Sequence, residues 1–346
     1  MYHIVYNQFI RDELEAENKE AYTAIVPIDF EKSEIAMGVF YGGDAGAKEA
    51  VVYNDAIWLL KFPKATRGYA NPQISYTTSP LSEYLGSKIY ESLDIPVHET
   101  MLGVRKNKII VACKDFTRKQ ETRSSQVSRG FHGLRQKRHL VPFHDLKNSF
   151  MSNDLDSYSG SGSETLLAEV LATIEGQDIL KSIHGVADRF WDMFVVDAFI
   201  GNNDRNNGNW GILIDPDNNE ASLAPVYDNG NAFFNKRSIE QMSKRLNSDE
   251  AMRNDAYLTP VCAFKYTGLD NEGHMINPFN FMKQDENVDC KAAVNRFVNR
   301  IKMEKIERLI EEIPESFGCL SVMPKVQKDF YIKLMRMRLE YINECL

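Results

Sequence analysis

The sequence predicts an α+β protein with two lobes: an N-terminal lobe built on an antiparallel β-sheet with one helix, and a mainly helical C-terminal lobe with a β-hairpin at its centre. Short apolar runs separated by turn residues occupy residues 35–113, as in an antiparallel sheet. Further along, apolar residues recur at helical spacing, apart from the hairpin. We therefore predict an N-terminal β-rich lobe over residues 1–116, a flexible basic and serine-rich connecting region over 117–160 and a helical lobe over 161–346.

Length and composition are those of an ordinary globular protein. The chain has 346 residues, of which 43% are hydrophobic and 11% aromatic, enough to bury a large core. Its net charge of −8 argues against a protein whose whole surface binds nucleic acid or an acidic membrane. The five cysteines are odd in number and include no Cys-x-x-Cys pair. We therefore expect neither a zinc site nor a disulfide framework. We expect a protein that works in a reducing compartment.

Several common functions lack their sequence patterns. The seven histidines form no His-x-x-His or His-Glu-x-x-His pattern, and no Gly-x-Ser-x-Gly occurs, which argues against a zinc hydrolase and a serine-hydrolase elbow. The N-terminal residues show no basic segment followed by an apolar one, and no apolar run approaches the ~18 residues of a membrane span. We therefore expect a cytoplasmic protein that does not insert into a membrane.

A glycine-rich segment interrupts the strands of the N-terminal lobe. Gly42, Gly43 and Gly46 would let the backbone approach a ligand closely, and the amides of this loop could face phosphates. It is not a Walker A loop, because Gly-Lys-Ser/Thr is absent. The alternative is an ordinary hairpin turn. The strands predicted around it and beyond it lie at residues 35–41, 50–53, 57–62, 97–104 and 108–113.

Lys61 is the one cation in an apolar strand, residues 57–62. An unpaired buried charge is costly, so we predict an anionic partner for it; the alternative is that its side chain reaches solvent. The predicted partner is Glu83, on a helix that Ser79 caps and Pro80 begins. Glu83 lies off the apolar stripe of that helix, so a solvated side chain is the alternative there, and Glu91 is a competing but weaker candidate for the partner. The stripe consists of Leu81, Leu85, Ile89 and Leu93.

Two segments of different character follow the sheet. Lys114, Asp115 and Phe116 leave the last strand, and we interpret them as a connector between the lobes whose backbone could hydrogen-bond a nucleobase. Residues 117–147 then carry eight lysines and arginines against two carboxylates. A solvated loop is the expected interpretation, and docking of an acidic or phosphorylated partner is the alternative. Without interleaved aromatic residues, this stretch gives no strong nucleic-acid signal.

The most informative segment is Gly-Asn-Asn-Asp-Arg-Asn-Asn-Gly-Asn at residues 201–209, followed by Tyr-Asp-Asn-Gly at 227–230. A helix with periodic apolar residues precedes it, and Gly201 is a natural end for that helix. Strands at 210–214 and 221–226, separated by Asp-Pro-Asp-Asn-Asn, predict a hairpin between the two polar segments.

This hairpin is expected to bring Asp204, Asn209 and Asp228 together. One carboxylate can align an attacking hydroxyl, while the amide oxygen and the second carboxylate can hold magnesium, which is the arrangement that phosphoryl transfer needs. The alternative is a loop in which Asn, Asp and Gly serve only the turn. The glycine loop and Lys61, upstream and in the right order, favour phosphoryl transfer.

The rest of the C-terminal lobe is predicted to be helical core. A capping box of Ser161 and Glu164 would begin a helix whose apolar residues run from 166 to 174. Further helices are predicted over 297–313 and 330–342, with a loop-rich stretch over 249–289.

The order of these motifs resembles a two-lobed protein-kinase-like fold, and specifically the HipA-like serine/threonine kinases of bacteria. The resemblance covers roughly residues 35–345, and its paired Asp and Asn segments are its most specific part. The matching segments are Trp-Leu-Leu-Lys-Phe-Pro at 58–63, Ser-Glu-Tyr-Leu at 82–85, and the polar segments within 199–209 and 225–230.

The resemblance implies that ATP binds between the lobes. Lys61 would hold the α- and β-phosphates and pair with Glu83, and the glycine loop would cover the triphosphate. The connector of Lys114, Asp115 and Phe116 would meet the adenine.

The same resemblance assigns the catalytic groups. Asp204 would be the catalytic carboxylate, and Asn209 and Asp228 would be the ligands of Mg²⁺. The implied partners are proteins with serine or threonine hydroxyls. The serines of the segment 157–163 and of the basic stretch also offer hydroxyls for autophosphorylation, with no single site assignable. The resemblance is also the only indication of secretion and of a role in host cells.

Three other functions stay open. The Asp-Arg-x-x-x-Asn pattern also resembles phosphoinositide kinases, whose lipid headgroups the basic stretch could meet. A non-catalytic nucleotide-binding scaffold would dock partners, and a metal-dependent phosphohydrolase would use Asp204 and Asp228. The chain departs from eukaryotic kinases, since His-Arg-Asp, Asp-Phe-Gly and Ala-Pro-Glu are absent. Its short N-terminal part does not predict the antitoxin partner or the DNA binding of typical HipA.

Overall fold

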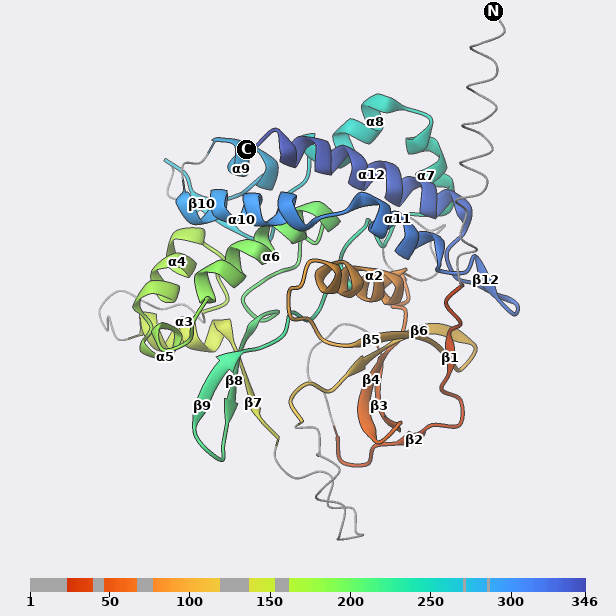
Figure 1. Ribbon diagram of the computed structural model, residues 1–346, viewed down its shortest axis with the longest axis horizontal. Helices are drawn as coiled ribbons and strands as arrows, with labels where there is room; N and C mark the ends of the chain where they lie inside the picture. The colour runs from red at the N-terminus through yellow and green to blue at the C-terminus, as the bar shows by residue number, and fades with distance from the viewer. Residues whose placement is uncertain are drawn as a thin grey trace, which may run out of the picture.

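The computed structural model describes residues 24–39, 47–66, 77–118, 137–152, 162–269, 272–284 and 287–346. These residues form the two predicted lobes, with a sheet in one and most of the helices in the other (Figure 1). The sheet has six strands in the order β1-β5-β6-β4-β3-β2, and among these described strands only β1 and β5 pair in parallel. The strands are β1 (Ile28–Asp29), β2 (Glu34–Ile35), β3 (Lys48–Tyr53), β4 (Ala56–Lys61), β5 (Thr100–Arg105) and β6 (Lys108–Lys114).

Two tight turns hold this sheet in register. β3 and β4 are joined by Asn54 and Asp55, with φ of 47° and 59°, and β5 and β6 by Lys106 and Asn107, with φ of 53° and 54°. Two consecutive residues with positive φ are typical of the two-residue hairpin turn that matches the twist of the strands. The turns predicted at these positions are confirmed, whereas β2 is shorter than the strand predicted over residues 35–41.

The helix of the N-terminal lobe, α2 (Ser79–Ser92), lies between the sheet and the C-terminal lobe (Figure 1). It packs against β5 and β6 on one side and against α11 (Met303–Glu311) on another. Pro80 stands in its first turn as predicted, but the residue that precedes the helix is Thr78, not Ser79. Residues 80–87 are all buried, because the first two turns of the helix are covered on every side, whereas Glu91 in its last turn is exposed. An apolar stripe is therefore no guide to which of its side chains meet solvent.

The C-terminal lobe is built around α6 (Val186–Ile200), which packs against α10 (Val288–Arg300) and α12 (Lys325–Asn343). α6 ends at Gly201, whose φ of 71° confirms the predicted stop. One hydrophobic core runs without a break from α2 to α12, so the two lobes share it. The other helices are α3 (Phe143–Met151), α4 (Leu167–Gly176), α5 (Asp178–Lys181), α7 (Ile239–Leu246), α8 (Asp249–Arg253), the π-helix η2 (Asn254–Leu258) and α9 (Pro278–Gln284).

Three predictions about this lobe are wrong in detail. The single helix predicted over 297–313 is broken, because Ile301 is extended, with φ of −65° and ψ of 133°, between α10 and α11. The stretch 249–289 contains α8, η2 and α9 besides its loops, and these helices are too short to show a period in the sequence. α4 begins at Leu167 without a side-chain cap, and Ser161 lies outside the described residues. Small hairpins also occur here, formed by β10 (Lys265–Thr267) with β11 (Gly273–Met275) and by β12 (Ser316–Phe317) with β13 (Leu320–Ser321).

A three-stranded sheet of β7 (His139–Pro142), β8 (Gly211–Asp215) and β9 (Glu220–Leu223) lies across from the six-stranded sheet (Figure 1). β8 and β9 are the predicted hairpin, and β7 is a strand that the sequence did not predict. A Cβ at Gly211 would lie 2.2 Å from the carbonyl oxygen of Val141, so only glycine lets β7 and β8 approach this closely. The hairpin returns the chain, so that 201–209 and 227–230 meet at one end of it.

In the described part of the chain, no helix combines the length and the apolar character needed to cross a membrane.

A buried arginine from α12 holds the end of α6. Arg338 is 1% exposed and donates to three backbone carbonyls: those of Phe199 at 3.1 Å, Asp255 at 3.1 Å and Ala256 at 3.0 Å. A Cβ on Gly201 would lie 2.6 Å from Nη1 of Arg338, so this glycine supplies room as well as positive φ. Buried carbonyls need a donor, and Arg338 provides it just before the polar segment 201–209.

We expect Arg338→Met to lower the free energy of unfolding by about 3 kcal/mol, because three buried carbonyls would lose their donor. Arg336→Met is the matched control on the same helix: Arg336 pairs with Glu307 at 2.5 Å on the surface, and a surface ion pair contributes less than about 1 kcal/mol. Urea denaturation of both variants measures the difference. Equal losses would contradict the role assigned to Arg338.

Candidate active site

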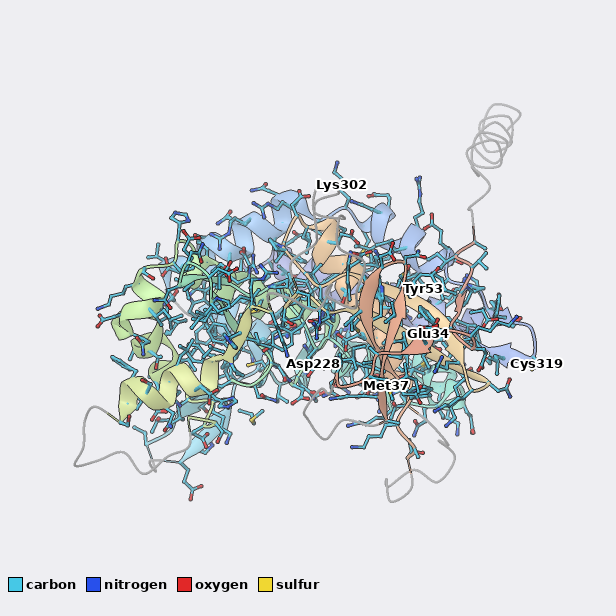
Figure 2. The ribbon with its side chains drawn as sticks, turned by 90° about the horizontal axis from the view of Figure 1, so that it is seen from below. Glu34, Met37, Tyr53, Asp228, Lys302 and Cys319 are labelled. Carbon is cyan, nitrogen blue, oxygen red and sulfur yellow. The ribbon has the colours of Figure 1, made fainter. Side chains whose placement is uncertain are left out.

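One lysine joins three segments that are distant in the sequence. Lys61 ends β4, and its Nζ lies 2.7 Å from Oε2 of Glu83 and 2.9 Å from Oδ1 of Asp228. The structure thus brings Lys61 to the carboxylate that the sequence predicts as its partner, and Glu83 is 1% exposed rather than solvated. Figure 2 shows Asp228 between the sheet of the N-terminal lobe and the helices of the C-terminal lobe.

The contact between these groups keeps both of them charged. Burial by itself would lower the pKa of Lys61, but the carboxylates of Asp228 and Glu83 outweigh it and raise this pKa well above its usual range. Burial would likewise raise the pKa of Glu83, but the Lys61 ammonium and the His98 imidazole outweigh it and hold this pKa below its usual range. Lys61 therefore presents a fixed cation between the lobes.

The second oxygen of Glu83 binds the C-terminal lobe. Oε1 accepts a hydrogen bond from the backbone N–H of Asn229 at 2.9 Å and lies 3.0 Å from Nε2 of His98. The Asn229 side chain donates from Nδ2 to Oγ of Ser87 at 3.0 Å. Gly86 permits this approach, since a Cβ there would lie 2.9 Å from Cβ of Asn229. α2 is thereby fastened to the segment that follows the hairpin.

Asp204 stands on the loop that follows Gly201. Its backbone N–H donates to Oδ1 of Asn202 at 3.2 Å, and its own Oδ1 accepts a hydrogen bond from Nδ2 of Asn206 at 3.0 Å. Partial burial raises the pKa of Asp204, the bond from Asn206 lowers it and the charge of Asp228 raises it, so the net shift is upward. A carboxylate with a raised pKa is a stronger proton acceptor than an ordinary aspartate.

Asn209 and Asp228 lie beside Asp204, as the hairpin predicts. Asn209 donates from Nδ2 to the backbone oxygen of Asp204 at 2.6 Å, which leaves its amide oxygen as the atom that would bind a cation. Asp228 has φ of 62°, a conformation that Asp and Asn adopt more readily than most residues. All three side chains line a single cavity.

Arg205 holds the two polar segments together. Its side chain is 1% exposed, and its Nε lies 2.8 Å from Oδ2 of Asp197 on α6. Nη1 donates to the carbonyl of Asn209 at 2.9 Å and to that of Tyr227, and Nη2 donates to Oδ1 of Asn229 at 2.5 Å. A guanidinium offers five N–H donors in one plane, which allows a single side chain to serve all of these acceptors.

The polar groups open onto a cavity of about 790 Å³ between the lobes. Within it, the rings of Phe116 and Tyr227 lie with centroids 5.5 Å apart. Cavities of this size and mixed character bind small molecules, and an aromatic wall together with charged groups suits a ligand with a flat ring system and an anionic end. The apolar wall is formed by Leu59, Cys113, Phe116, Leu140, Pro142 and Tyr227.

The predicted connector lines the same cavity. Lys114, Asp115 and Phe116 follow one another at the end of β6, and all three line it. The backbone N–H of Asp115 donates to the carbonyl of Ile57 at 2.9 Å, and its carboxylate accepts from the backbone N–H of Thr117 at 3.0 Å. The carboxylate of Asp115 therefore shapes the turn, and Phe116 supplies the aromatic surface.

Two sequence predictions fall outside the described residues. Gly42, Gly43 and Gly46 lie within 40–46, and most of the basic stretch lies within 119–136. Lys48, which follows the glycine segment, lines the cavity, so the described chain resumes at the edge of the site.

One cluster beside the site has the spacing of metal ligands but the chemistry of a hydrogen-bond network. Glu83, His98 and Cys113 each have a ligand atom within 4.8 Å of the others. Both oxygens of Glu83 already bind Lys61 and the backbone N–H of Asn229. Burial raises the pKa of the Cys113 thiol, which keeps it protonated, and a thiol must lose its proton to bind a metal.

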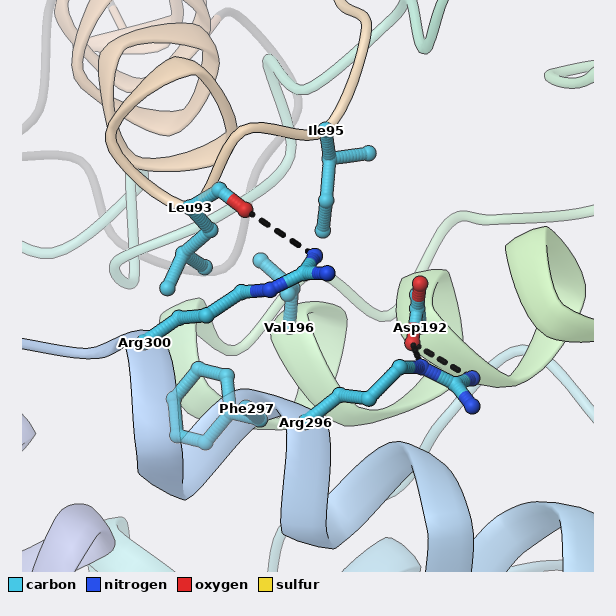
Figure 3. Close-up of a pocket in the computed structure, with 7 residues that line it drawn as sticks. All are labelled: Leu93, Ile95, Asp192, Val196, Arg296, Phe297 and Arg300. Carbon is cyan, nitrogen blue, oxygen red and sulfur yellow. Dashed lines mark hydrogen bonds and ion pairs between the residues drawn. The ribbon is translucent and has the colours of Figure 1, made fainter.

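A second cavity, between the end of α2 and helices α6 and α10, is too small for a ligand. Its volume of about 10 Å³ is room for one water molecule. Figure 3 shows its two arginines: Arg300 donates to the carbonyl of Leu93 at 3.3 Å, and Arg296 binds Asp192 at 2.8 Å. These contacts link α10 to its neighbours and have no chemical role that the geometry indicates.

Sequence reasoning missed three residues that support the site: His98, Arg205 and Asn229. Arg205 and Asn229 stand inside the predicted polar segments, but hydrogen bonds to distant backbone atoms leave no pattern in a sequence. The available signal for Arg205 was a single arginine in a loop of neutral amides. His98 had no such signal, since it falls within a stretch predicted as a strand.

Comparisons with known proteins show what the chain as a whole is similar to. The chain matches the model of the HipA-like C-terminal domain over residues 44–315. It is 34% identical to the serine/threonine-protein kinase CtkA of Helicobacter pylori over 303 residues, which are 88% of this chain and 82% of that protein. The crystal structure of a Helicobacter pylori proinflammatory kinase, CtkA, aligns with a TM-score of 0.76 and 31% identity, over 92% of this chain and 96% of that chain. A complex of HipA, HipB and operator DNA from Shewanella oneidensis aligns with a TM-score of 0.49 and 13% identity, over 89% of this chain and 66% of that chain.

The fold prediction is therefore confirmed as a two-lobed kinase-like fold, and so is the resemblance to HipA-like proteins.

We expect Arg205→Lys to lower the free energy of unfolding by about 3 kcal/mol, because an ammonium cannot reach Asp197, the two carbonyls and Asn229 together, and a broken buried ion pair is costly. Hydrogen exchange should quicken within residues 201–209 and 227–230 while the six-stranded sheet keeps its protection.

The matched control is Arg300→Lys, since Arg300 is exposed and makes a single long bond to a carbonyl. Urea denaturation and hydrogen exchange should show little change in this control. An Arg205→Lys protein with unaltered exchange in both polar segments would refute the role of Arg205.

Proposed function

The chain belongs to the HipA-like C-terminal domain family, and on that premise we propose that it is an ATP-dependent serine/threonine protein kinase. It would transfer the γ-phosphoryl group of Mg-ATP to a serine or threonine hydroxyl. The observation that carries this proposal is the ion pair of Lys61 with Glu83 and Asp228 at the edge of a cavity that Asp204 and Asn209 also line. A fixed cation, a base and oxygen ligands for a metal, gathered at one place, are what phosphoryl transfer requires.

The mixed lining of the cavity supports a nucleotide as the ligand. The apolar wall with Phe116 and Tyr227 suits the adenine ring, and the connector residue Phe116 is part of this wall. Lys61 suits the phosphates, and its ion pair with Glu83 holds the ammonium in place before the nucleotide binds. The connector and Lys61 would therefore act on opposite ends of one ATP molecule.

The donor set at the hairpin suits Mg²⁺. The amide oxygen of Asn209 and the carboxylate of Asp228 are the oxygen ligands that this ion prefers, and Mg²⁺ commonly takes its other ligands from water and phosphate. Held there, the ion would offset the charge on the transferring phosphoryl group. The direct contact of Lys61 with Asp228 places the proposed metal ligand next to the proposed phosphate-binding cation.

Asp204 is the group proposed to act on the acceptor. Its carboxylate faces the cavity, and the hydrogen bond from Asn206 fixes its orientation. It would accept a hydrogen bond from the acceptor hydroxyl, align the oxygen with the phosphorus and take the proton as the new bond forms. The raised pKa of Asp204, caused mainly by burial, favours that proton transfer.

Protein acceptors are favoured over lipids, because the relative at 34% identity over 88% of this chain is named a serine/threonine-protein kinase. The serines of the segment 157–163 and of the basic stretch offer hydroxyls for autophosphorylation. A non-catalytic scaffold would have no use for an oriented base beside metal ligands.

We expect Asp204→Asn to keep the fold and the affinity for ATP but to lose at least about 100-fold in phosphoryl transfer, since the base is removed while its shape is kept. The assay uses labelled ATP with Mg²⁺ and offers a protein mixture and phosphatidylinositol vesicles side by side, with phosphosite mapping of the enzyme itself. Asp217→Asn, in the exposed turn between β8 and β9, is the matched control. Retained transfer in Asp204→Asn would reject the assignment, and label found in lipid alone would make the protein a lipid kinase.

We expect Asp228→Asn to weaken ATP binding only when Mg²⁺ is present, because the variant loses a charged metal ligand and Asn adopts the φ of 62° equally well. Calorimetric titration of ATP into both proteins, with Mg²⁺ and with EDTA, measures this. An affinity for Mg-ATP equal to that of the unmodified protein would show that Asp228 does not hold the ion.

A further inference from the structure

A polar groove adjoins the site on the side of Asp204. Its volume is about 310 Å³. Asn231, Asn235 and Lys236 line this groove and also line a smaller cavity of about 180 Å³, which we call the inner cavity. Asp204, Asp228 and Lys61 line the inner cavity as well, so the groove and the inner cavity meet beside the proposed catalytic groups. We call it the acceptor groove; its lining residues are Gly201, Asn203, Asn231, Phe234, Asn235, Lys236, Arg237 and Gln241.

The floor of the acceptor groove is a short turn held in an unusual conformation. Phe233 and Phe234 both have φ of 53°, which is strained for bulky side chains and is found mainly where the surroundings enforce it. α2 supplies part of that enforcement: the carbonyl of Asn235 accepts the backbone N–H of Thr78 at 2.8 Å, and the carbonyl of Ala232 accepts Oγ of Ser82 at 3.0 Å. The groove is therefore built before any acceptor binds.

Four side-chain amides line the acceptor groove, and their chemistry matches that of a peptide backbone. Each amide has two donor hydrogens and an acceptor oxygen, so it can bind the N–H and C=O groups of an extended segment. All four also make hydrogen bonds within the protein. Asn231 Nδ2 donates to Asn203 Oδ1 at 2.5 Å, Asn235 Nδ2 donates to the carbonyl of Gly230 at 2.5 Å, and Gln241 Oε1 accepts the backbone N–H of Ser238 at 2.9 Å. The remaining donors and acceptors of these amides are the ones that can meet a peptide backbone. The four residues are Asn203, Asn231, Asn235 and Gln241.

The charge of the acceptor groove is positive in a protein whose net charge is −8. Of its lining residues, Lys236 and Arg237 are charged, and none is a carboxylate. Both terminal nitrogens of Arg237, Nη1 and Nη2, donate to the carboxylate of Asp255, so the charge of Arg237 is largely compensated. Lys236 is exposed and stands where the groove opens into the inner cavity, and its charge also acts on Asp204, whose pKa it lowers.

From these observations we infer that the acceptor groove binds the acceptor polypeptide in extended form, and that Lys236 selects a carboxylate close to the accepting serine or threonine. This inference rests on the proposed function and adds its substrate class: serines or threonines flanked by Asp or Glu. The ammonium of Lys236 would meet the flanking carboxylate while the amides hold the backbone and the hydroxyl reaches Asp204.

The test uses three peptides that differ only in the residues flanking a single serine: Asp, Gln or Lys. The full chain should phosphorylate the Asp peptide with a kcat/KM about fivefold above that of the Gln peptide, as expected for one partly exposed ion pair, and the Lys peptide least well. Lys236→Gln should remove the preference, and Lys236→Glu should reverse it. Raising the salt concentration should weaken the preference in the unmodified protein.

Lys244→Glu is the matched control. Lys244 is exposed on the neighbouring helix α7, pairs with Glu240 and lies outside the acceptor groove, while its substitution changes the net charge by the same amount. This variant should keep the order of the three peptides. If it reverses that order as Lys236→Glu does, the effect belongs to overall charge and the inference is wrong.

Binding of fluorescent versions of the peptides, followed by anisotropy, separates the inference from the proposed function. Equal rates and affinities for the three peptides, or an order unchanged in Lys236→Glu, would overturn the inference while the kinase assignment stands. If the protein transfers no phosphate to any acceptor, the proposed function fails. The order of the three peptide affinities, measured by anisotropy for the unmodified protein and for Lys236→Glu, then still decides whether the groove selects carboxylates.

Discussion

The guanidinium of Arg205 is the point where the helical core, the loop 201–209 and the segment after the hairpin meet. It is buried against Asp197, whose carboxylate also accepts the hydroxyl of Tyr90 from α2 at 2.8 Å. Its Nη1 donates to the carbonyls of Asn209 and Tyr227, and its Nη2 donates to the side chain of Asn229. Because a buried charge must be compensated by fixed partners, Arg205 permits only a narrow range of positions for Asn209 and Asp228 relative to α6.

The second constraint is the attachment of α2 to the C-terminal lobe. One carboxylate oxygen of Glu83 binds Lys61, and the other accepts the backbone N–H of Asn229. Ser82 and Ser87 add hydrogen bonds to residues 229–232. The hydrophobic core that the two lobes share also joins α2 to the helices of the C-terminal lobe. The two lobes therefore differ in secondary structure but are not separate units around the site, and the position of Lys61 depends on both.

Local chemistry decides which of these features the sequence could predict. Lys61 and Gly201 each follow from the demands of one residue: a charge that needs a partner, or a helix end that needs positive φ. The turns at Asn54 and Lys106 are the breaks between predicted strands. The hairpin prediction brought Asp204, Asn209 and Asp228 to one cavity because strand length and turn residues are local as well.

What could not be predicted depends on contacts between distant segments. The burial of Glu83 arises because the first two turns of α2 are covered on all sides, so the period of its apolar residues carried no information about that position. The roles of Arg205, His98 and Asn229 are hydrogen bonds across the fold, and such bonds impose no spacing on the chain. The break at Ile301 separates α10, which packs against α6, from α11, which packs against α2, and these partners are distant in the sequence.

The fastening of α2 has a consequence for inhibitor design. A compound that displaces α2 and binds in its place would first have to break three hydrogen bonds: those of Glu83 and Ser87 with Asn229, and that of Ser82 with Ala232. Breaking each of them costs about 1 kcal/mol. Compounds that leave these bonds intact and compete for the aromatic wall avoid that cost. Selectivity would then have to come from the side chains of the wall itself.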